Sequence, residues 1–261
     1  MTDHGTHIDE YDDATVALLE LVWGKGFMAP GGAENVQKLV SGLDVKDKTI
    51  LDIGCGLGGG DLVLAGELGA RVIGIDLEAP LIARARVYAE QAGLSDLIEY
   101  RHVQPGALDF PDSTIDIVCS SGAFTQTSDK AGIFAEVMRV LKPGGHITAY
   151  EWMGNGQPLS EDMLHWFELE GLTYALESIS AHKRLLEDAG FTDVTVTDDG
   201  GWYKEEARAE YDLLVGEMKE TATALLGAGQ YAHFLEDWAG MITVLGKGEL
   251  VPGFLRGTKP G

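Results

Sequence analysis

The residues best suited to chemistry in this chain form a glycine-rich segment, ILDIGCGLGGG, at residues 50–60. An apolar run leads into it and a helical pattern follows, as in a turn between a buried strand and a helix. Glycines at such a turn permit a tight bend and let backbone N–H groups approach a ligand closely. The spacing also fits G-x-G-x-x-G, which is typical of nucleotide binding. The glycines expected at the ligand are Gly54, Gly56 and Gly58.

Two carboxylates near this turn narrow the class of ligand. Asp76 ends the next apolar run, RVIGID, where its carboxylate is placed to accept hydrogen bonds from ribose hydroxyls, and Leu77 follows it as a further expected contact. Asp52 stands two residues before the first glycine, where a dinucleotide-binding segment usually has an apolar residue. A carboxylate at that position suits a ligand that carries an ammonium group and a sulfonium. The sequence therefore favours S-adenosylmethionine over NAD as the cofactor.

The elements that must position these residues alternate between strand and helix patterns. Expected strands are residues 49–54, 71–76, 97–103, 114–120 and 146–152, and expected helices are residues 16–23, 33–42, 61–69, 79–93 and 131–141. Five strands separated by helices of this length predict a parallel sheet that is covered on both faces. Later elements are an aromatic-rich helix over 161–176, a helix over 180–191, a strand over 192–198, helices over 204–226 and 230–245, and a last strand near 252–258.

The same pattern divides the chain into four expected parts. Residues 1–44 form an N-terminal lid with helices, and residues 45–155 form the cofactor-binding core. Residues 156–179 interrupt the alternation as a helical cap insertion. Residues 180–261 complete the core and add a helical elaboration.

Three segments resemble motifs of the class I S-adenosylmethionine-dependent methyltransferases. DIGCGLGG is similar to their first motif, GID to the segment with the ribose-binding acid, and VLKPGGHI to their last sheet motif. The resemblance covers roughly residues 45–200 and implies a Rossmann-like α/β fold. Its sheet has seven strands, mostly parallel, with an antiparallel final strand and helices on both faces. The resemblance further implies that Gln104, or else Asp109, binds the adenine amine, and that Ser120 and Ser121 lie where cofactor and acceptor meet.

The N-terminal segment resembles one group within that family. YDDATVALLELVWGKGFMAPGG is similar to a segment of the phosphoethanolamine and sarcosine/dimethylglycine N-methyltransferases, and residues 116–126 are similar to a later motif of the same enzymes. This resemblance implies that Tyr11 is a catalytic tyrosine in a segment that closes over the site. Gln126 stands where these enzymes have a histidine, and Gly122 where they have a substrate-binding aspartate.

The missing histidine leaves the identity of the catalytic base open. Gln126 can hydrogen-bond but cannot titrate near neutral pH. Glu151 is a candidate because active-site loops gather at the carboxyl ends of parallel strands, and His165 and His182 are further candidates. Alternatively, the nucleophile needs only desolvation and orientation. The lost charge at Gly122, and the absence of clustered basic residues near the C-terminus, disfavour phosphoethanolamine as the acceptor.

These features predict an S-adenosylmethionine-dependent methyltransferase that acts on a small-molecule acceptor, with N-methylation of an amine favoured. The first alternative is S- or O-methylation of a small thiol or hydroxy compound. An NAD-dependent oxidoreductase and a non-catalytic cofactor-binding protein are less favoured.

Composition limits the expected partners and location. The 19 Lys and Arg residues against 42 Asp and Glu residues give a formal charge of −23, which argues against binding of nucleic-acid phosphates. No stretch approaches ~18 apolar residues, so no membrane span is expected, and the acidic N-terminus is unlike a signal peptide. Cys55 and Cys119 have no metal-binding spacing and favour a reducing compartment. We expect a soluble cytoplasmic protein without a metal, and the sequence leaves a homo-oligomer open.

Overall fold

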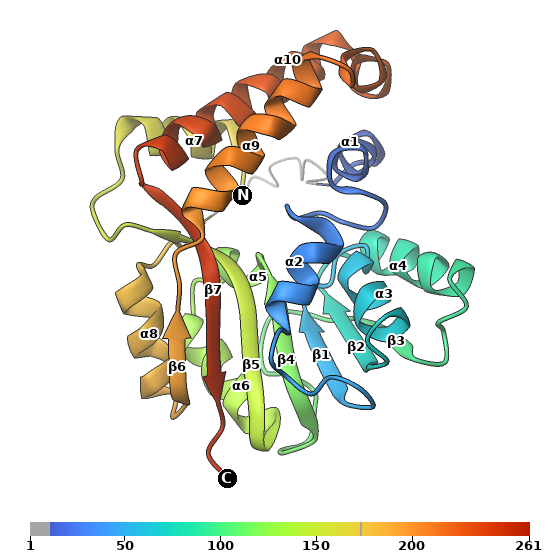
Figure 1. Ribbon diagram of the computed structural model, residues 1–261, viewed down its shortest axis with the longest axis vertical. Coiled ribbons are helices and arrows are strands. Elements are labelled where there is room, and N and C mark those ends of the chain that lie inside the picture. Colours follow the sequence, from blue (N-terminus) through green and yellow to red (C-terminus); the bar gives the residue numbers. More distant parts are fainter. Residues whose placement is uncertain (1–10, 173) are drawn as a thin grey trace, which may run out of the picture.

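The computed structural model describes residues 11–172 and 174–261, and at its centre lies one sheet of seven strands (Figure 1). The strand order is β3-β2-β1-β4-β5-β7-β6. The strands are β1 (Thr49–Ile53), β2 (Arg71–Asp76), β3 (Ile98–His102), β4 (Ile115–Ser121), β5 (Leu141–Gly154), β6 (Thr192–Val196) and β7 (Leu250–Thr258). Strand β7 runs antiparallel to β5 and β6, and the pairs among β1 to β5 are parallel. The expected seven-stranded, mostly parallel sheet is confirmed.

Helices cover both faces of the sheet because its strands are apolar on both sides. Successive residues of β1 show this, since Ile50 packs on one face and Leu51 on the other, and both are fully buried. A one-residue shift in register would exchange these faces, so the two apolar clusters fix the register. The first face lies under α2 (Gly32–Leu39), α3 (Gly59–Gly66) and α4 (Ala79–Gln91), and the second under α5 (Ala123–Gln126), α6 (Lys130–Val140) and α8 (Ile179–Asp188).

A layer of helices, which we call the cap, lies over the carboxyl ends of the parallel strands (Figure 1). It consists of α1 (Asp13–Trp23), α7 (Glu161–Glu170), α9 (Gly200–Val215) and α10 (Lys219–Gly246). The cap has an apolar cluster of its own, in which Trp166 and Tyr203 are fully buried. Trp152, near the end of β5, packs against both rings and so joins the cap to the sheet.

Several elements differ from the sequence expectation. Helix α7 ends at Glu170 instead of residue 176, because Gly171 adopts the left-handed conformation that ends helices. The LKPGG segment, expected as a turn, is the start of β5. Helix α5 was not expected, since an element of four residues carries no periodic pattern. The break expected between residues 226 and 230 is present as a kink at Gly227 within α10, and a further break that was not expected separates α9 from α10 at residues 216–218.

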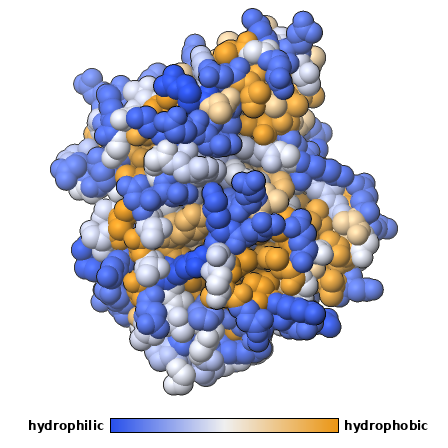
Figure 2. All heavy atoms as spheres, in the orientation of Figure 1, coloured by the Kyte–Doolittle hydropathy of each residue, from blue (hydrophilic) through white to orange (hydrophobic). Residues whose placement is uncertain are grey.

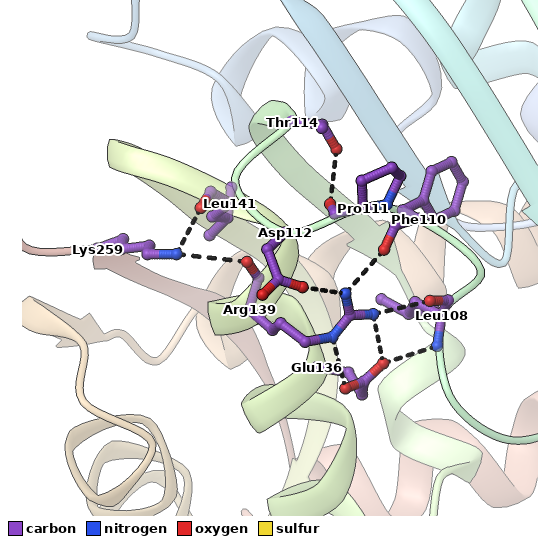
Figure 3. A network of polar contacts seen from close by, with 9 residues as sticks. All are labelled: Leu108, Phe110, Pro111, Asp112, Thr114, Glu136, Arg139, Leu141 and Lys259. Atoms are coloured by element: carbon purple, nitrogen blue, oxygen red, sulfur yellow. Dashed lines mark hydrogen bonds and ion pairs between the residues drawn. The ribbon is translucent and has the colours of Figure 1, made fainter.

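Arg139 of α6 fixes the connection between β3 and β4 (Figure 3). Its guanidinium donates to the backbone carbonyls of Leu108 and Phe110, at 2.8 and 2.7 Å. It also donates to the carboxylates of Glu136 and Asp112, at 2.8 and 2.7 Å. The planar guanidinium carries five N–H donors, so a single side chain can hold several points of one loop. The connection that leaves β3 is therefore held in place relative to the sheet.

Hydrophilic atoms cover much of the surface on the side shown in Figure 2, and hydrophobic surface gathers below the cap and again on the cap itself. Within residues 11–172 and 174–261, no helix has the length and apolar character needed to cross a membrane.

Candidate functional site

The glycine-rich segment forms a tight turn between β1 and α3, as the sequence predicts. Gly54, Gly56 and Gly58 have φ angles of +77°, +52° and +79°, in the left-handed region where residues with a Cβ are strained. A Cβ at Gly54 would collide with the Cβ of Ala123, and a Cβ at Gly58 would collide with the hydroxyl of Tyr100. Glycine is therefore required at these positions by both the backbone and the available space.

Several N–H groups of this turn are bonded within the protein. Gly54 and Cys55 both donate to the carbonyl of Ile75, at 2.8 and 3.1 Å. The N–H group of Gly56 donates to Oδ2 of Asp76 at 2.8 Å. These donors hold the turn against β2 and are not directed at a ligand, which differs from the expectation from sequence. At these positions glycine lets the backbone of the turn pack closely against its neighbours, and the N–H groups are not available to bind a ligand.

A cavity opens between the glycine turn and the N-terminal segment. The loop of residues 26–30, helix α2 and the turn line it. Its polar lining residues are Asp52, Ser121 and Asn35. The Oδ1 atom of Asn35 is buried, and no donor within the described part of the chain reaches it. A carboxylate and an unsatisfied acceptor that line the same cavity suit a ligand that donates hydrogen bonds, such as an ammonium group.

Asp52 supplies negative charge to the lining of this cavity. Burial raises the pKa of Asp52 to about 6, and the charge of Asp76 adds to that rise, while the neighbouring side chains of Asp61 and Cys119 oppose it. A carboxyl group with this pKa is mostly ionised at pH 7. Asp52 therefore presents negative charge to the cavity at pH 7, and its contact with the cationic end of a cofactor stays a prediction.

Asp76 and Leu77 lie at the carboxyl end of β2, where ribose contacts were predicted. Oδ2 of Asp76 accepts from Gly56 and Oδ1 accepts from the N–H group of Glu78 at 2.9 Å. A carboxylate has about four acceptor sites, so Asp76 retains capacity for ribose hydroxyls while it holds the turn. Leu77 is 51% exposed, so its side chain is accessible to a ligand.

Gln104, the predicted adenine contact, is exposed two residues beyond β3. Its Nε2 atom lies 3.4 Å from Nε2 of His102, and the same ring nitrogen is 3.0 Å from the carbonyl of Leu77. The three residues therefore follow one another along the carboxyl ends of β2 and β3. This places Gln104 beside the predicted ribose site, and its contact with adenine stays a prediction.

Ser120 and Glu151 face each other in the interior. Glu151 is fully buried, and its Oε2 atom accepts from the N–H group and the hydroxyl of Thr125 at 2.7 and 2.8 Å. Burial raises the pKa of Glu151 to about 7, and the hydrogen bonds from Thr125 oppose the rise. These contacts hold α5 against β5. The hydroxyl group on the cavity wall is that of Ser121, so the cofactor role of Ser120 and the base role of Glu151 stay predictions.

Tyr11 lies against the glycine turn. Its ring packs on the apolar cluster of Val16, Leu57 and Leu81, of which Leu57 belongs to the turn itself. Tyr11 is also near enough to Tyr174, beyond α7, to influence the pKa of that residue. Gln126 is exposed at the end of α5. The structure thus brings Tyr11 to the predicted site, and the catalytic roles of Tyr11 and Gln126 stay predictions.

The two histidine candidates differ in their surroundings. His182 is buried, its Nδ1 atom is 3.1 Å from the carbonyl of Ser178, and burial lowers its pKa. It is therefore a neutral core residue near pH 7. His165 is exposed on α7.

Residues 51–149 match the family model described as a methyltransferase domain. These residues are a methyltransferase domain. They include the glycine turn, Asp52 and Asp76, so the resemblance to methyltransferases that the motifs indicated is confirmed. Relatives extend the similarity beyond this domain: phosphoethanolamine N-methyltransferase 3 of Arabidopsis thaliana is 30% identical over 212 residues, which is 81% of this chain and 42% of that protein.

Solved structures show the same fold around the methyltransferase domain. Phosphoethanolamine N-methyltransferase 2 of Haemonchus contortus, in complex with phosphomonomethylethanolamine and S-adenosylhomocysteine, aligns with a TM-score of 0.89 at 24% identity, over 97% of this chain and 59% of that one. A putative sarcosine dimethylglycine methyltransferase from Galdieria sulphuraria aligns with a TM-score of 0.81 at 19% identity, over 95% of this chain and 98% of that one. The chain spans about half the length of the curated relatives it matches.

Sequence reasoning missed part of the cavity wall. Asn35 and Met28 line the cavity, although the segment around Met28 was interpreted only as a loop and that around Asn35 only as a helix. The signal available in the sequence was the GFMAPGG segment, whose glycines and proline mark a fixed turn close to the ligand.

Proposed function

We propose that this chain transfers a methyl group from S-adenosylmethionine to the nitrogen of a small amine that carries no phosphate group. The observation that carries the proposal is the carboxylate of Asp52 on the cavity beside the glycine turn of a methyltransferase domain. The names of the relatives support a small amine as the acceptor.

The cap favours a positively charged acceptor without a phosphate. Glu210 and Asp237 are buried in it, at 3% and 7% exposure. Burial raises the pKa of Glu210 to about 7 and that of Asp237 to about 8. In the described ranges, 11–172 and 174–261, no Lys or Arg forms an ion pair with either carboxyl group. Near pH 7 Glu210 is only partly ionised and Asp237 mostly protonated. An ammonium group beside them would favour their ionised forms, whereas a phosphate ester would find no cationic partner at either group.

Aromatic rings lie between this acidic part of the cap and the glycine turn. Trp152, Trp166 and Tyr174 pack against one another with ring centroids 5.4 to 6.0 Å apart. Tyr174 is the ring that comes near Tyr11, which itself contacts the turn. Faces of Trp and Tyr attract alkylammonium ions by cation–π interaction. Trp166 is fully buried, so Trp152 and Tyr174, which are half-buried, are the rings of this group that could contact an acceptor.

The bound cofactor supplies a methyl group on a sulfonium, and transfer forms an N–C bond as the C–S bond breaks. The chain's own residues have three tasks in this scheme. Asp52 binds the cationic end of the cofactor, and Asp76 holds both the turn and the ribose. Tyr11 orients the neutral amine after it has lost its proton to solvent, and the cap excludes water so that the amine is desolvated.

The test is release of S-adenosylhomocysteine from S-adenosylmethionine with separate acceptors. We expect turnover with ethanolamine, sarcosine or dimethylglycine, loss of turnover in Asp52→Ala, and unchanged turnover in Glu90→Gln, which alters an exposed acid of α4. Turnover with phosphoethanolamine alone would contradict an acceptor without phosphate. Turnover with none of these amines but with thiols or hydroxy compounds would contradict N-methylation.

A further inference from the structure

Asp61, in the first turn of α3, is a buried carboxyl group to which the site described above assigns no task. It is 0% exposed, and neither of its oxygens accepts a hydrogen bond from an N–H or O–H donor in the described part of the chain. Buried acids are normally paired or hydrogen-bonded, because an isolated charge in the interior is costly. The groups within hydrogen-bonding reach of Asp61 are the carboxyl of Asp52 and the hydroxyl of Tyr100.

The sheet explains why these groups meet. Asp52 of β1 is in register with Cys119 of β4 on one side and with Gly74 of β2 on the other, and Gly74 is in register with Tyr100 of β3. Residues in register on parallel strands point to the same face. These four positions therefore form one row across the sheet, on the face that α3 covers.

Gly74 provides the space in this row that Asp61 fills. A Cβ at Gly74 would lie 2.8 Å from Oδ2 of Asp61 and 2.7 Å from the ring of Tyr100. The carboxyl group of Asp61 thus descends from α3 into the gap between Asp52 and Tyr100. Only glycine at position 74 leaves room for this buried carboxyl group, so the packing of the sheet fixes the position of Asp61.

Among the residues that the structure describes, no Lys, Arg or His forms an ion pair with Asp52 or Asp61. The titratable groups that face this pair are Asp76 at the end of β2, Tyr100 on β3, Cys119 on β4 and Cys55 in the glycine turn, and all of them are acids. Burial, with the charge of Asp52, raises the pKa of Asp61 far above its usual range. Two adjacent carboxyl groups in such surroundings cannot both be ionised.

We propose that Asp61 is a positioning residue which stays protonated and donates a hydrogen bond to the Asp52 carboxylate, so that Asp52 remains ionised and directed at the cationic end of the cofactor. This inference rests on the proposed function. One proton resides on Asp61, behind the cavity, and the negative charge resides on Asp52, at its wall. No proton needs to leave the pair when a cation binds at pH 7.

The test compares wild type, Asp61→Asn, Asp61→Ala and the exposed-acid control Glu90→Gln. Affinity for S-adenosylhomocysteine, which keeps the ammonium group, is measured by calorimetry from pH 5 to pH 8. The affinity of wild type should fall below about pH 6, because Asp52 becomes protonated there. Asn keeps a donor without a charge, so Asp61→Asn should leave the midpoint of this fall unchanged. Asp61→Ala removes the donor and should move the midpoint upward by about half a unit to one unit.

A merely structural role would lower affinity in Asp61→Ala at every pH without a change in midpoint, and that result would overturn the inference. A downward shift in Asp61→Asn would mean that Asp61 is ionised in wild type, and would overturn it as well. Failure of wild type to bind S-adenosylhomocysteine at any pH would instead overturn the proposed function and this inference with it.

Melting temperature without ligand gives a second measurement that does not depend on binding. At pH 8, Asp61→Asn should melt no lower than wild type. In wild type, folding must keep the Asp61 carboxyl protonated at a pH where it is ionised in the unfolded chain, and Asn removes this cost. A melting temperature well below that of wild type at pH 8, with no such loss in Glu90→Gln, would contradict a protonated Asp61.

Discussion

The indole N–H of Trp23 donates to Oε1 of Glu210 at 2.6 Å, and so joins residues 187 positions apart in the sequence. The other oxygen of Glu210 accepts from the indole N–H of Trp238 at 3.1 Å. Helix α1 is therefore connected to α9 and α10 through one buried carboxyl group. On its other side α1 is connected to the core, since Glu20 accepts from the hydroxyl of Tyr88 at 2.8 Å. Helix α1 thus links the cap to the α/β core.

Removing the Trp23 donor should weaken this link. Trp23→Phe leaves Oε1 of Glu210 buried without its donor, and we expect the free energy of unfolding to fall by about 1 to 3 kcal/mol. The Michaelis constants for cofactor and acceptor should both rise, because α1 leads into the loop of residues 26–30 that lines the cavity and is bonded to the cap. Urea denaturation and steady-state kinetics measure these effects. Trp202→Phe, at a residue that packs through its ring against Tyr150, is the matched control and should cost less. Equal losses in both variants would contradict a specific role for the Trp23 bond.

Stability should fall as pH rises from 5 to 8. Burial raises the pKa of Glu151 and Glu210 to about 7 and that of Asp237 to about 8, whereas these groups titrate near ~4 in an unfolded chain. The folded protein therefore holds more protons than the unfolded chain in this range, so raising the pH favours unfolding. Because one pKa unit corresponds to about 1.4 kcal/mol, the loss should reach a few kcal/mol. Calorimetric melting at several pH values measures it, and a melting temperature that rises toward pH 8 would contradict it.

Gly58 and Gly93 separate the cost of lost space from the cost of backbone strain. Both have positive φ, +79° and +70°, so Ala is strained at either position. A Cβ at Gly93 meets nothing within 4 Å, whereas a Cβ at Gly58 would collide with Tyr100. Gly58→Ala should therefore destabilise by several kcal/mol and weaken cofactor binding, and Gly93→Ala by only about 1 kcal/mol. Thermal melting compares the two variants. Similar values for both would mean that the turn can move away from Tyr100.

Asp76→Ala should reduce both cofactor affinity and stability, because Asp76 accepts from Gly56 and Glu78 in addition to its predicted ribose contacts. We expect each loss to be about 1 to 3 kcal/mol. Calorimetric titration with cofactor and chemical denaturation measure them separately. Unchanged affinity together with reduced stability would show that Asp76 serves the turn and not the ribose.

Tyr11→Phe should lower turnover more than cofactor affinity. Its ring contact with Leu57 is kept by Phe, whereas the hydroxyl that is predicted to orient the acceptor is lost. A fall in kcat of about tenfold or more is expected for a positioned polar group. Turnover equal to wild type, under conditions where acceptor is saturating, would exclude a catalytic role for this hydroxyl.

Much of the fold could be predicted from local patterns. The apolar run before Gly54 predicts β1, and the glycine turn predicts the start of α3. Because the strand is apolar on both faces, Ile50 and Leu51 are expected to pack against two different layers of helices, as they do. The position of Asp52 at the cavity also followed from its spacing to the turn. These features depend on residues close together in the sequence, so periodicity and turn chemistry are sufficient to find them.

Other features depend on partners far apart in the sequence. Which of Ser120 and Ser121 lines the cavity depends on which way each points, and successive residues of a strand point to opposite faces. The bond between Trp23 and Glu210 exists only because α9 and α10 close over α1. In the sequence, Asp61 is a polar residue at the start of a helix pattern. Only the pairing of β1 with β2, which leaves a gap at Gly74, places its carboxyl group beside Asp52.

The carbonyl of Gly26 accepts from the N–H group of Gly59 at 2.9 Å, so the segment after α1 rests directly on the backbone of α3. A Cβ at Gly59 would lie 2.5 Å from that oxygen, and no side chain fits between the two segments. The loop of residues 26–30 lines the cavity, and α1, which precedes this loop, is bonded to the cap through Trp23. The outer wall of the cavity and the cap are therefore connected, so under the proposed function an opening that admits the cofactor would also displace the cap.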